Sequence, residues 1–211
     1  MVEPDTSVEQ SLWLSGVLRV AGVDEVGLGP LAGPVVAAAC IVPAGCRLIP
    51  GVRDSKTLSH SQRERLLVEI LRQAAAVGVG AASVGEIERL NVLAASRLAM
   101  RRALDKVGPV DHILVDGRPI PGWSPGVCTA IIDGDALVYS IACASIVAKV
   151  VRDRLMAKLA LRFPDYGWER NAGYPTRDHL VALRSLGPTP FHRLSFGPVR
   201  ELRGSFGAFC R

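Results

Sequence analysis

Residues 20–42, VAGVDEVGLGPLAGPVVAAACIV, constrain the fold more than any other part of the chain. An apolar stretch, Leu18–Val23, leads into the adjacent carboxylates Asp24 and Glu25 and then into a bend rich in glycine and proline. A second apolar run, Val35–Val42, follows, so the segment predicts a strand, a bend and another strand. Two neighbouring acids at the end of a buried strand repel each other and resist desolvation, so we expect a cation to compensate them.

Length and composition favour one globular domain. The 211 residues are 49% hydrophobic, enough to bury a sizeable core. The longest near-continuous apolar run covers eight residues, whereas a membrane-spanning helix needs about 20, and the acidic start lacks the basic region of a signal peptide. We therefore expect a soluble cytoplasmic protein with no membrane partner. A flexible tail is predicted over residues 1–15 and the single domain over residues 16–211.

Cysteine and histidine usage argues against zinc. The five cysteines are odd in number and include no C-x-x-C pair, and the four histidines are scattered along the chain. A structural zinc site needs these residues in clusters. We expect reduced thiols and a different metal.

Charge is distributed unevenly along the chain. Residues 149–211 carry twelve Lys or Arg against five acids, a net +7, whereas residues 1–148 carry thirteen against fifteen, a net −2. A basic segment beside an acidic catalytic region suits a polyanion held by one surface and cut at another. A solvated basic face is an equally good interpretation of the charge alone.

Hydrophobic periodicity predicts alternating helices and strands beyond the first two strands. A capping-box pattern, Ser59 to Gln62, opens a helix over about 60–76, and Leu93, Leu98 and Leu104 mark the inward face of the next. This order predicts an α/β architecture with a mixed sheet. The expected strands are 77–84, 112–115 and 127–132, and the expected helices are 60–76, 91–107, 136–161, 177–186 and 196–203.

Four acids share one position in this pattern, because each lies at or just beyond the end of a predicted strand. They are Asp24, Glu25, Asp116 and Asp135. Open α/β sheets gather function at strand ends, and carboxylate oxygens are the ligands that Mg²⁺ prefers. A set of four suits two divalent ions about 4 Å apart, the arrangement of metal-assisted phosphoryl transfer. Taken singly, each acid is better explained by turn chemistry.

The chain resembles ribonuclease HII from about Val20 to Val199. The resemblance implies an RNase H-like fold, in which helices flank a central mixed β-sheet, with a small helical C-terminal extension. It rests on an ordered set of stretches: AGVDEVGLGPLAGPVVAA from Ala21, DSKTLS from Asp54, LVDG from Leu114, Gly134-Asp135, SIVAKVVRDR from Ser145, AGYPT from Ala172 and HRLSFGPV from His192.

The activity implied by this resemblance is hydrolysis of the RNA strand in RNA–DNA hybrids. It includes incision on the 5′ side of a ribonucleotide embedded in duplex DNA, leaving 3′-hydroxyl and 5′-phosphate ends. The family's metal-binding and catalytic carboxylates map onto Asp24, Glu25, Asp116 and Asp135, which would hold two Mg²⁺ or Mn²⁺ ions. Asp135 is preferred to Asp133 because it directly follows a glycine, as in the family. The runner-up, Asp153, is better explained as an ion-paired helix acid.

The resemblance also implies how substrate is recognised. In the family a Gly-Arg-Gly bend and a tyrosine read the ribose, and these map onto Gly27, Leu28, Gly29 and Tyr174. Leucine cannot make a charge-assisted contact to phosphate, so we expect a weaker grip on the substrate backbone. Further substrate-binding candidates, with these four, are Ser55, Lys56, Lys149 and Arg193. Lys149 is explained nearly as well by a lysine that covers apolar surface. His192 and Arg193 either brace the C-terminal loop or meet the DNA strand, and a structural role is preferred for His192.

Two other functions compete with this interpretation. The spacing Gly27-x-Gly29-x-x-x-Gly33 nearly matches a dinucleotide-binding fingerprint, but Pro34 leads into a strand where that motif requires a helix. The second is a protein that binds RNA–DNA hybrids but cleaves them poorly because of Leu28. The intact set of four acids argues against a pure binder. The chain shows no heptad or apolar stripe that requires a partner, so we expect a monomer.

Overall fold

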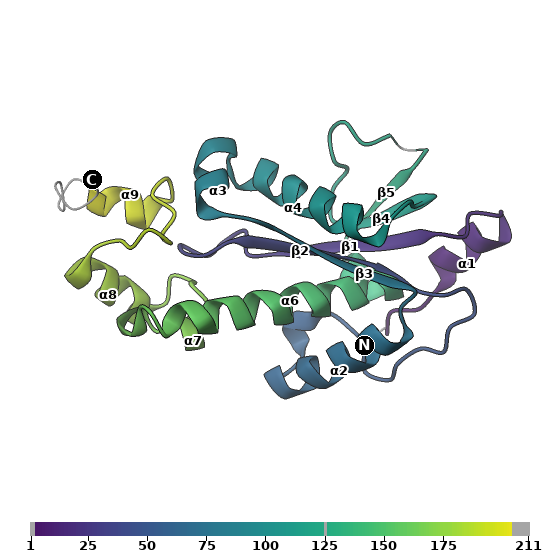
Figure 1. Cartoon of the computed structure of the whole chain (residues 1–211), viewed down its shortest axis with the longest axis horizontal. Coiled ribbons are helices and arrows are strands. Elements are labelled where there is room, and N and C mark those ends of the chain that lie inside the picture. The colour runs from purple at the N-terminus through teal and green to yellow at the C-terminus, as the bar shows by residue number, and fades with distance from the viewer. Residues whose placement is uncertain (1–2, 125, 204–211) are drawn as a thin grey trace.

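A five-stranded mixed β-sheet forms the centre of the protein in the computed structural model, which describes residues 3–124 and 126–203 (Figure 1). The strand order is β3-β2-β1-β4-β5; β1 pairs antiparallel with β2 and parallel with β4. The strands are β1 (Val20–Val26), β2 (Val35–Ile41), β3 (Ala76–Ala82), β4 (His112–Asp116) and β5 (Cys128–Ile131). The predicted mixed sheet flanked by helices is confirmed.

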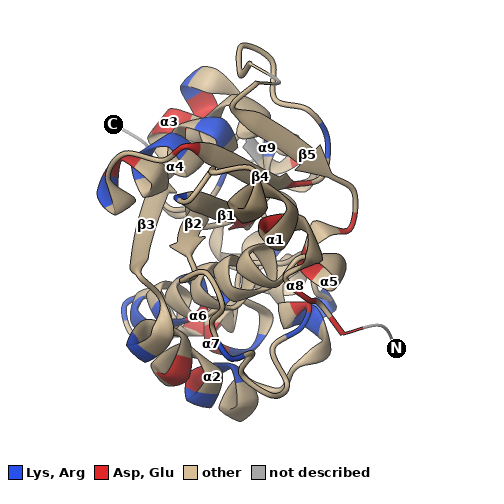
Figure 2. Ribbon diagram, turned by 90° about the vertical axis from the view of Figure 1, so that its right-hand side faces the viewer, with Lys and Arg blue, Asp and Glu red and all other residues tan. Residues whose placement is uncertain are grey.

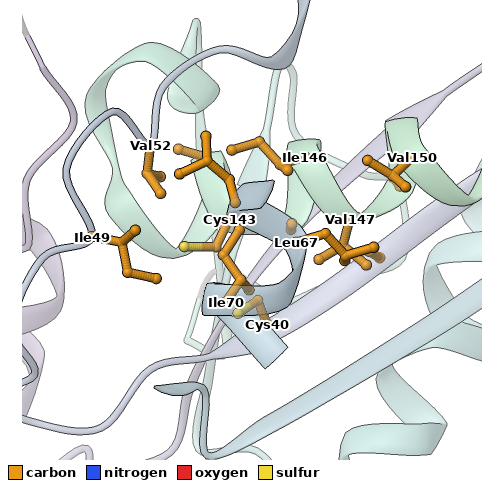
Figure 3. Packing of buried hydrophobic residues seen from close by; sticks show 14 of the residues in the cluster. Cys40, Ile49, Val52, Leu67, Ile70, Cys143, Ile146, Val147 and Val150 are labelled. Atoms are coloured by element: carbon orange, nitrogen blue, oxygen red, sulfur yellow. The ribbon is translucent and has the colours of Figure 1, made fainter. Parts of the chain in front are cut away.

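Helices cover both faces of the sheet. One face packs against α6 (Tyr139–Ala160), which in turn contacts α2 (His60–Gln73), and the other against α4 (Val92–Val107), which follows α3 (Val84–Leu90) (Figure 1). The predicted capping box at the start of α2 is present, because the Ser59 hydroxyl accepts from the Gln62 amide and the Gln62 side chain accepts from the Ser59 amide. Figure 3 shows part of the core between α6, α2 and the sheet, where Cys40, Cys143 and Ile146 are fully buried.

The inward face of α4 differs from the predicted one. Leu93 is 57% exposed, and Leu98 and Leu104 lie at the edges of the contact, while small residues occupy its centre. The reason is the close approach of α4 to the edge strand β3, where a Cβ on Gly80 would overlap the backbone carbonyl of Ala99. Only small side chains fit between backbones at this distance. The buried residues of this helix are Ala95, Ser96, Ala99, Met100, Ala103 and Val107.

The N-terminal segment also departs from the prediction. Residues expected to form part of a flexible tail fold into α1 (Ser7–Leu14). Glu9 is fully buried, and its carboxylate accepts a hydrogen bond of 2.9 Å from the backbone N–H of Ser140, at the start of α6. A carboxylate at a helix N-terminus satisfies an otherwise unpaired amide and interacts favourably with the helix dipole. This contact spans 131 positions of the chain, so local periodicity could not reveal it.

Short helices close one end of the molecule beyond α6 (Figure 1). They surround a small aromatic core in which Trp168 and Leu183 are completely buried. The helices are η2 (Pro164–Tyr166), α7 (Trp168–Asn171), α8 (Arg177–Leu186) and α9 (Gly197–Arg203), and η1 (Ser55–Thr57) and α5 (Gly134–Leu137) lie nearer the sheet. The predicted helices near 177–186 and 196–203 correspond to α8 and α9.

Basic side chains are not confined to this C-terminal end. Figure 2 shows Lys and Arg around α2 and α7 and again around α3 and α4, interspersed with acids. Among the residues that the structure describes, no helix is long and apolar enough to cross a membrane.

Candidate active site

Two of the predicted carboxylates are brought together by the pairing of parallel strands. Val23 of β1 lies opposite Val115 of β4, so Asp24 and Asp116 follow at neighbouring strand ends. Parallel strands present their carboxyl ends at the same edge of a sheet, which explains why residues 92 positions apart meet. Asp24 is buried and Asp116 is half-buried at this edge.

The third acid reaches the same place through the turn after β5. The backbone N–H of Gly134 donates a 2.7 Å hydrogen bond to Oδ1 of Asp116, which fixes the start of α5 against the end of β4. Asp135, in the first turn of α5, is consequently buried beside them. Asp133 adopts a left-handed conformation (φ 55°) and is exposed, so the structure favours Asp135 over Asp133 as a member of the group.

Electrostatic repulsion makes the clustered acids hard to ionise together. Burial, reinforced by the charges of Glu25, Asp116 and Asp135, raises the pKa of Asp24 well above its usual value. Burial and the charge of Asp116 raise the pKa of Glu25 to about 7. Burial likewise raises the pKa of Asp135, although Lys56 opposes that increase.

The chemistry of the donor set fits a hard divalent cation. A cation would favour the ionised forms that burial and mutual repulsion now oppose, and all four residues offer the oxygen ligands that Mg²⁺ and Mn²⁺ prefer. Among residues 3–124 and 126–203, no group of three or more Asp, Glu, His or Cys side chains lies close enough together to hold a metal ion as the side chains are placed here. The fit therefore rests on donor chemistry and burial.

Lys56 and Ser55, both predicted to bind substrate, occupy different environments. The ammonium of Lys56 lies 3.2 Å from Asp135 and 3.9 Å from Asp54, while the side chain remains 76% exposed at the rim of the acidic group. Ser55 is buried, and its hydroxyl accepts a 2.8 Å hydrogen bond from Ser145. The buried hydroxyl braces η1 against α6, so the expectation that Ser55 contacts substrate is not supported by its position.

The glycine-rich bend lies beside Tyr174, as the predicted ribose-reading pair requires. Gly27 has φ 102°, and a side chain there would overlap the guanidinium of Arg152. A Cβ on exposed Gly29 would lie 3.7 Å from the Tyr174 ring, which is itself accessible. The Leu28 side chain is half-buried and packs against the hydrophobic cluster of α4 and the sheet.

Of the two roles predicted for Arg193, bracing matches its position and a side-chain contact to substrate does not. Its side chain is completely buried, so it cannot contact substrate directly. Its guanidinium instead donates to the carbonyl oxygens of Gly27 at 2.6 Å, Leu28 at 3.0 Å and Gly33 at 2.8 Å. The arginine holds the bend from behind, a contact between segments about 165 residues apart.

Lys149 and Asp153 form part of an ion-pair group on α6. The Lys149 ammonium lies 2.6 Å from Asp153, which also pairs with Arg63 of α2 at 3.3 Å. This confirms the preferred interpretation of Asp153 as an ion-paired helix acid. Lys149 is largely buried by the same contacts, so its predicted substrate contact remains a prediction.

Two buried histidines support the loop of Tyr174, and one of them, His179, carried no clear signal in the sequence. Nδ1 of His179 lies 2.8 Å from the backbone carbonyl oxygen of Tyr174, and its Nε2 lies 3.1 Å from Nε2 of His192. Both rings are buried against Trp168, whose indole N–H donates to His179. His192 therefore has the structural role preferred from the sequence. His179 could not be singled out because its partners lie in other loops.

The bend does not form a dinucleotide-binding site. Pro34 leads directly into β2, so the segment has no helix N-terminus at which a pyrophosphate could bind. The predicted strand after Pro34 is confirmed.

Comparison with known proteins identifies relatives along nearly the whole chain. The family model Ribonuclease HII matches residues 21–199. A Ribonuclease HII from Thermosynechococcus vestitus is 57% identical over 202 residues, which cover 96% of this chain and 94% of that protein. The crystal structure of the ribonuclease H2 from Pyrococcus horikoshii OT3 has a TM-score of 0.72 and 26% identity, covering 90% of this chain and 99% of the other. The crystal structure of Bst-RNase HIII in complex with Mn²⁺ has a TM-score of 0.66 and 19% identity, covering 90% of this chain and 70% of the other. At this identity the similarity shows the fold alone.

Proposed function

Because the chain belongs to the ribonuclease HII family and is thus an RNase H endoribonuclease, we propose that it cleaves the RNA strand of RNA–DNA hybrids and incises duplex DNA 5′ of embedded ribonucleotides. The observation that carries this proposal is the juxtaposition of Asp24, Asp116 and Asp135 at one sheet edge. The products carry 3′-hydroxyl and 5′-phosphate ends. The described residues of one chain supply the acids, the bend and Tyr174 together, which supports a monomer; the cytoplasm is the location proposed with this activity.

Asp24, Glu25, Asp116 and Asp135 would hold two divalent ions, Mg²⁺ or Mn²⁺. When bound, such ions supply Lewis acidity toward the phosphate and an activated water, so no protein nucleophile is required. The protein contributes a buried set of carboxylates and a rim residue, Lys56, whose exposed ammonium favours an incoming phosphate. Burial and, to a lesser extent, mutual repulsion raise the pKa values of Asp24 and Glu25, and a bound cation would offset both effects, which is consistent with this role.

Substrate selection depends on the bend and Tyr174. Ribose differs from deoxyribose by the 2′-hydroxyl, so discrimination needs fixed groups close to the sugar. Gly27 and Gly29 allow the backbone to approach, and the exposed Tyr174 ring beside Gly29 offers a flat surface for a sugar or base. This supports reading of the 2′-hydroxyl by the bend.

The first test is incision of a DNA duplex that contains one internal ribonucleotide. With Mg²⁺ or Mn²⁺ we expect a single cut on the 5′ side of the ribonucleotide. The Asp116→Asn variant removes one charge of the acidic group while keeping its shape, so its rate should fall on the order of 100-fold or more. Denaturing electrophoresis with end-labelled markers measures both the position of the cut and the rate.

The second candidate function is hybrid binding with impaired cleavage, and Leu28 is the observation that favours it. A leucine on the bend provides no phosphate contact. The two functions separate in the same assay: binding without incision at any Mg²⁺ or Mn²⁺ concentration would establish the binder and exclude the enzyme. An all-DNA duplex of the same sequence serves as the substrate control.

A further inference from the structure

Two arginines are buried directly behind the substrate-reading bend. Arg152 of α6 and Arg193 of the C-terminal loop are each 0% exposed, which is rare for this residue type unless it is paired. Neither has a carboxylate within ion-pair distance among the described residues. Their hydrogen-bond partners are backbone carbonyl groups, and the charges of Asp153 and Glu88 act on them only without direct contact, so neither cation is paired with an anion among the described residues.

The carbonyl groups that accept from these arginines belong to the bend and to the loop that carries Tyr174. Arg193 donates to Gly27, Leu28 and Gly33. Arg152 donates to Pro34 at 3.0 Å, Ala172 at 2.9 Å and Ala32 at 3.2 Å. The backbone N–H of Leu31 adds a 2.8 Å bond to Gly173. The arginines therefore join the bend and the tyrosine loop into one rigid unit.

These contacts also decide where the amides of the bend point. In a trans peptide the C=O and N–H groups point in opposite directions, and the described residues contain no cis peptide bond. Because the carbonyl groups of Gly27 and Leu28 point inward to Arg193, the N–H groups of Leu28 and Gly29 point away from it. Neither N–H has a hydrogen-bond partner among the described residues. Two adjacent amides without partners, one of them on the exposed Gly29, suit one anionic oxygen group.

Close packing of the two cations adds to the attraction for an anion. Burial and the neighbouring charge of Arg152 lower the pKa of Arg193 to about 9, so the two guanidinium groups repel each other. Charges in a low-dielectric interior act over longer distances than exposed charges, which water screens. A phosphate at the bend would compensate this buried positive charge.

We propose that Arg193, reinforced by Arg152, is a positioning residue that turns the Leu28 and Gly29 amides toward a substrate phosphate and supplies the positive charge that Leu28 lacks. This inference rests on the proposed function. It explains how a leucine is tolerated in the bend: its side chain packs into the hydrophobic cluster, while the attraction for phosphate comes from behind.

The test measures binding rather than cleavage, so that it is independent of the proposed activity. Fluorescence anisotropy of a labelled duplex with one ribonucleotide gives Kd in an Asp116→Asn background. Arg193→Gln should raise Kd about tenfold or more, the loss expected for charge-assisted hydrogen bonds, and Arg193→Lys should recover part of it. Arg65→Gln is the matched control, because Arg65 is 58% exposed on α2 and pairs with Glu69; its Kd should stay within about twofold.

A second pair of variants removes an amide without touching the arginines. Gly29→Ala keeps the N–H and adds a Cβ at an ordinary contact distance from Tyr174, whereas Gly29→Pro deletes the N–H. We expect Gly29→Pro to bind about tenfold more weakly than Gly29→Ala. Thermal unfolding of each variant, measured first, shows that binding is compared between folded proteins.

Two results would overturn the inference: a folded Arg193→Gln protein with parental Kd, or equal Kd for Gly29→Pro and Gly29→Ala. If Arg193→Gln does not fold, the Gly29 pair decides. A parent protein that fails to incise would contradict the proposed function and leave these binding comparisons valid.

Discussion

At the scale of single residues, the site depends on charges placed where water cannot screen them. Asp24 is buried among other acids at the end of β1, and Arg193 is buried among carbonyl groups behind the bend. The acids have one cationic neighbour, Lys56, whereas Arg193 has backbone carbonyl groups rather than carboxylates as its hydrogen-bond partners. Leu28 lies on the bend that Arg193 supports from behind.

Replacing Leu28 by arginine tests whether a positive charge at this position strengthens substrate binding. The Leu28→Arg variant should lower KM for the ribonucleotide-containing duplex by several-fold, because a guanidinium adds a charge-assisted phosphate contact, while kcat changes little. Steady-state incision kinetics measure both constants. Leu28→Gln, which is polar but uncharged, is the control, since half-buried Leu28 also contributes packing. Equal KM in the parent and Leu28→Arg would show that the bend has no need of a surface charge.

At the scale of elements, close approach of backbones sets the geometry of the sheet and its helices. Gly22 of β1 lies against the start of α6, where a Cβ would overlap backbone atoms of Ser140, and Gly78 and Gly80 of β3 lie against α4. The acids at the end of β1 are thereby held at a fixed depth relative to α6. Large side chains at these positions would push the covering helices away.

The contact between β3 and α4 can be tested with a pair of glycine variants. Gly80→Ala should lower the free energy of unfolding by about 1–3 kcal/mol, because the new methyl group overlaps the α4 backbone, which cannot yield like a flexible side chain. Gly85→Ala, within α3 and with no atom near its Cβ, should instead raise it by about 0.4–1 kcal/mol. Urea unfolding measures both changes. If Gly80→Ala leaves the free energy of unfolding unchanged, α4 must shift away from β3 without loss of stability.

At the scale of the whole molecule, the C-terminal helices are tied to the sheet through the bend. Ala32 forms an isolated bridge with His192, and the Gly33 amide donates to Phe191. The buried pair His179 and His192 connects this loop to the Tyr174 carbonyl group. The region proposed to read substrate thus depends on the folding of a segment far along the chain.

This connection predicts an acid-sensitive stability. Burial, and to a lesser extent His179, lowers the pKa of His192 to about 3, below the unfolded value of about 6.5. The unfolded state therefore binds a proton first as the pH falls, so the stabilisation is complete above about pH 6.5 and is lost progressively toward pH 3. The loss should approach about 1 kcal/mol per pH unit.

The measurement compares the parent with His192→Gln. Chemical denaturation at several pH values between 7 and 4 gives the free energy of unfolding of each protein. The buried carboxylates, whose pKa values are raised, make the protein more stable as the pH falls, which is the reverse of the effect of His192. Both proteins contain these carboxylates, so subtracting one free energy from the other removes their contribution. The stability advantage of the parent should shrink as the pH falls. A constant difference across this range would contradict neutral burial of His192.

Much of the fold could be predicted because its strands and helix starts follow from patterns within short stretches of sequence. The strand ends that bear Asp24 and Asp116 follow from apolar runs that stop at acids, and the start of α2 follows from Ser59 and Gln62. The inward face of α4 could not be predicted, since Ala95 and Ala99 are selected by the nearness of β3 rather than by their own hydrophobicity. The folding of α1 depends on the contact between Glu9 and Ser140, which are too far apart in the sequence for a local pattern to reveal it.

The amino-acid sequence by itself determined the family, through its ordered motifs, and the residues proposed to carry the chemistry: the acids at strand ends and the glycine bend with its leucine. The tertiary structure alone decided which of them meet and how. Arg193, for which the sequence left bracing and substrate contact open, is a buried support of the bend, and Ser55, an expected substrate contact, is buried against α6. The physical reason is that burial and hydrogen-bond partners depend on the path of the whole chain, whereas residue type and spacing are local.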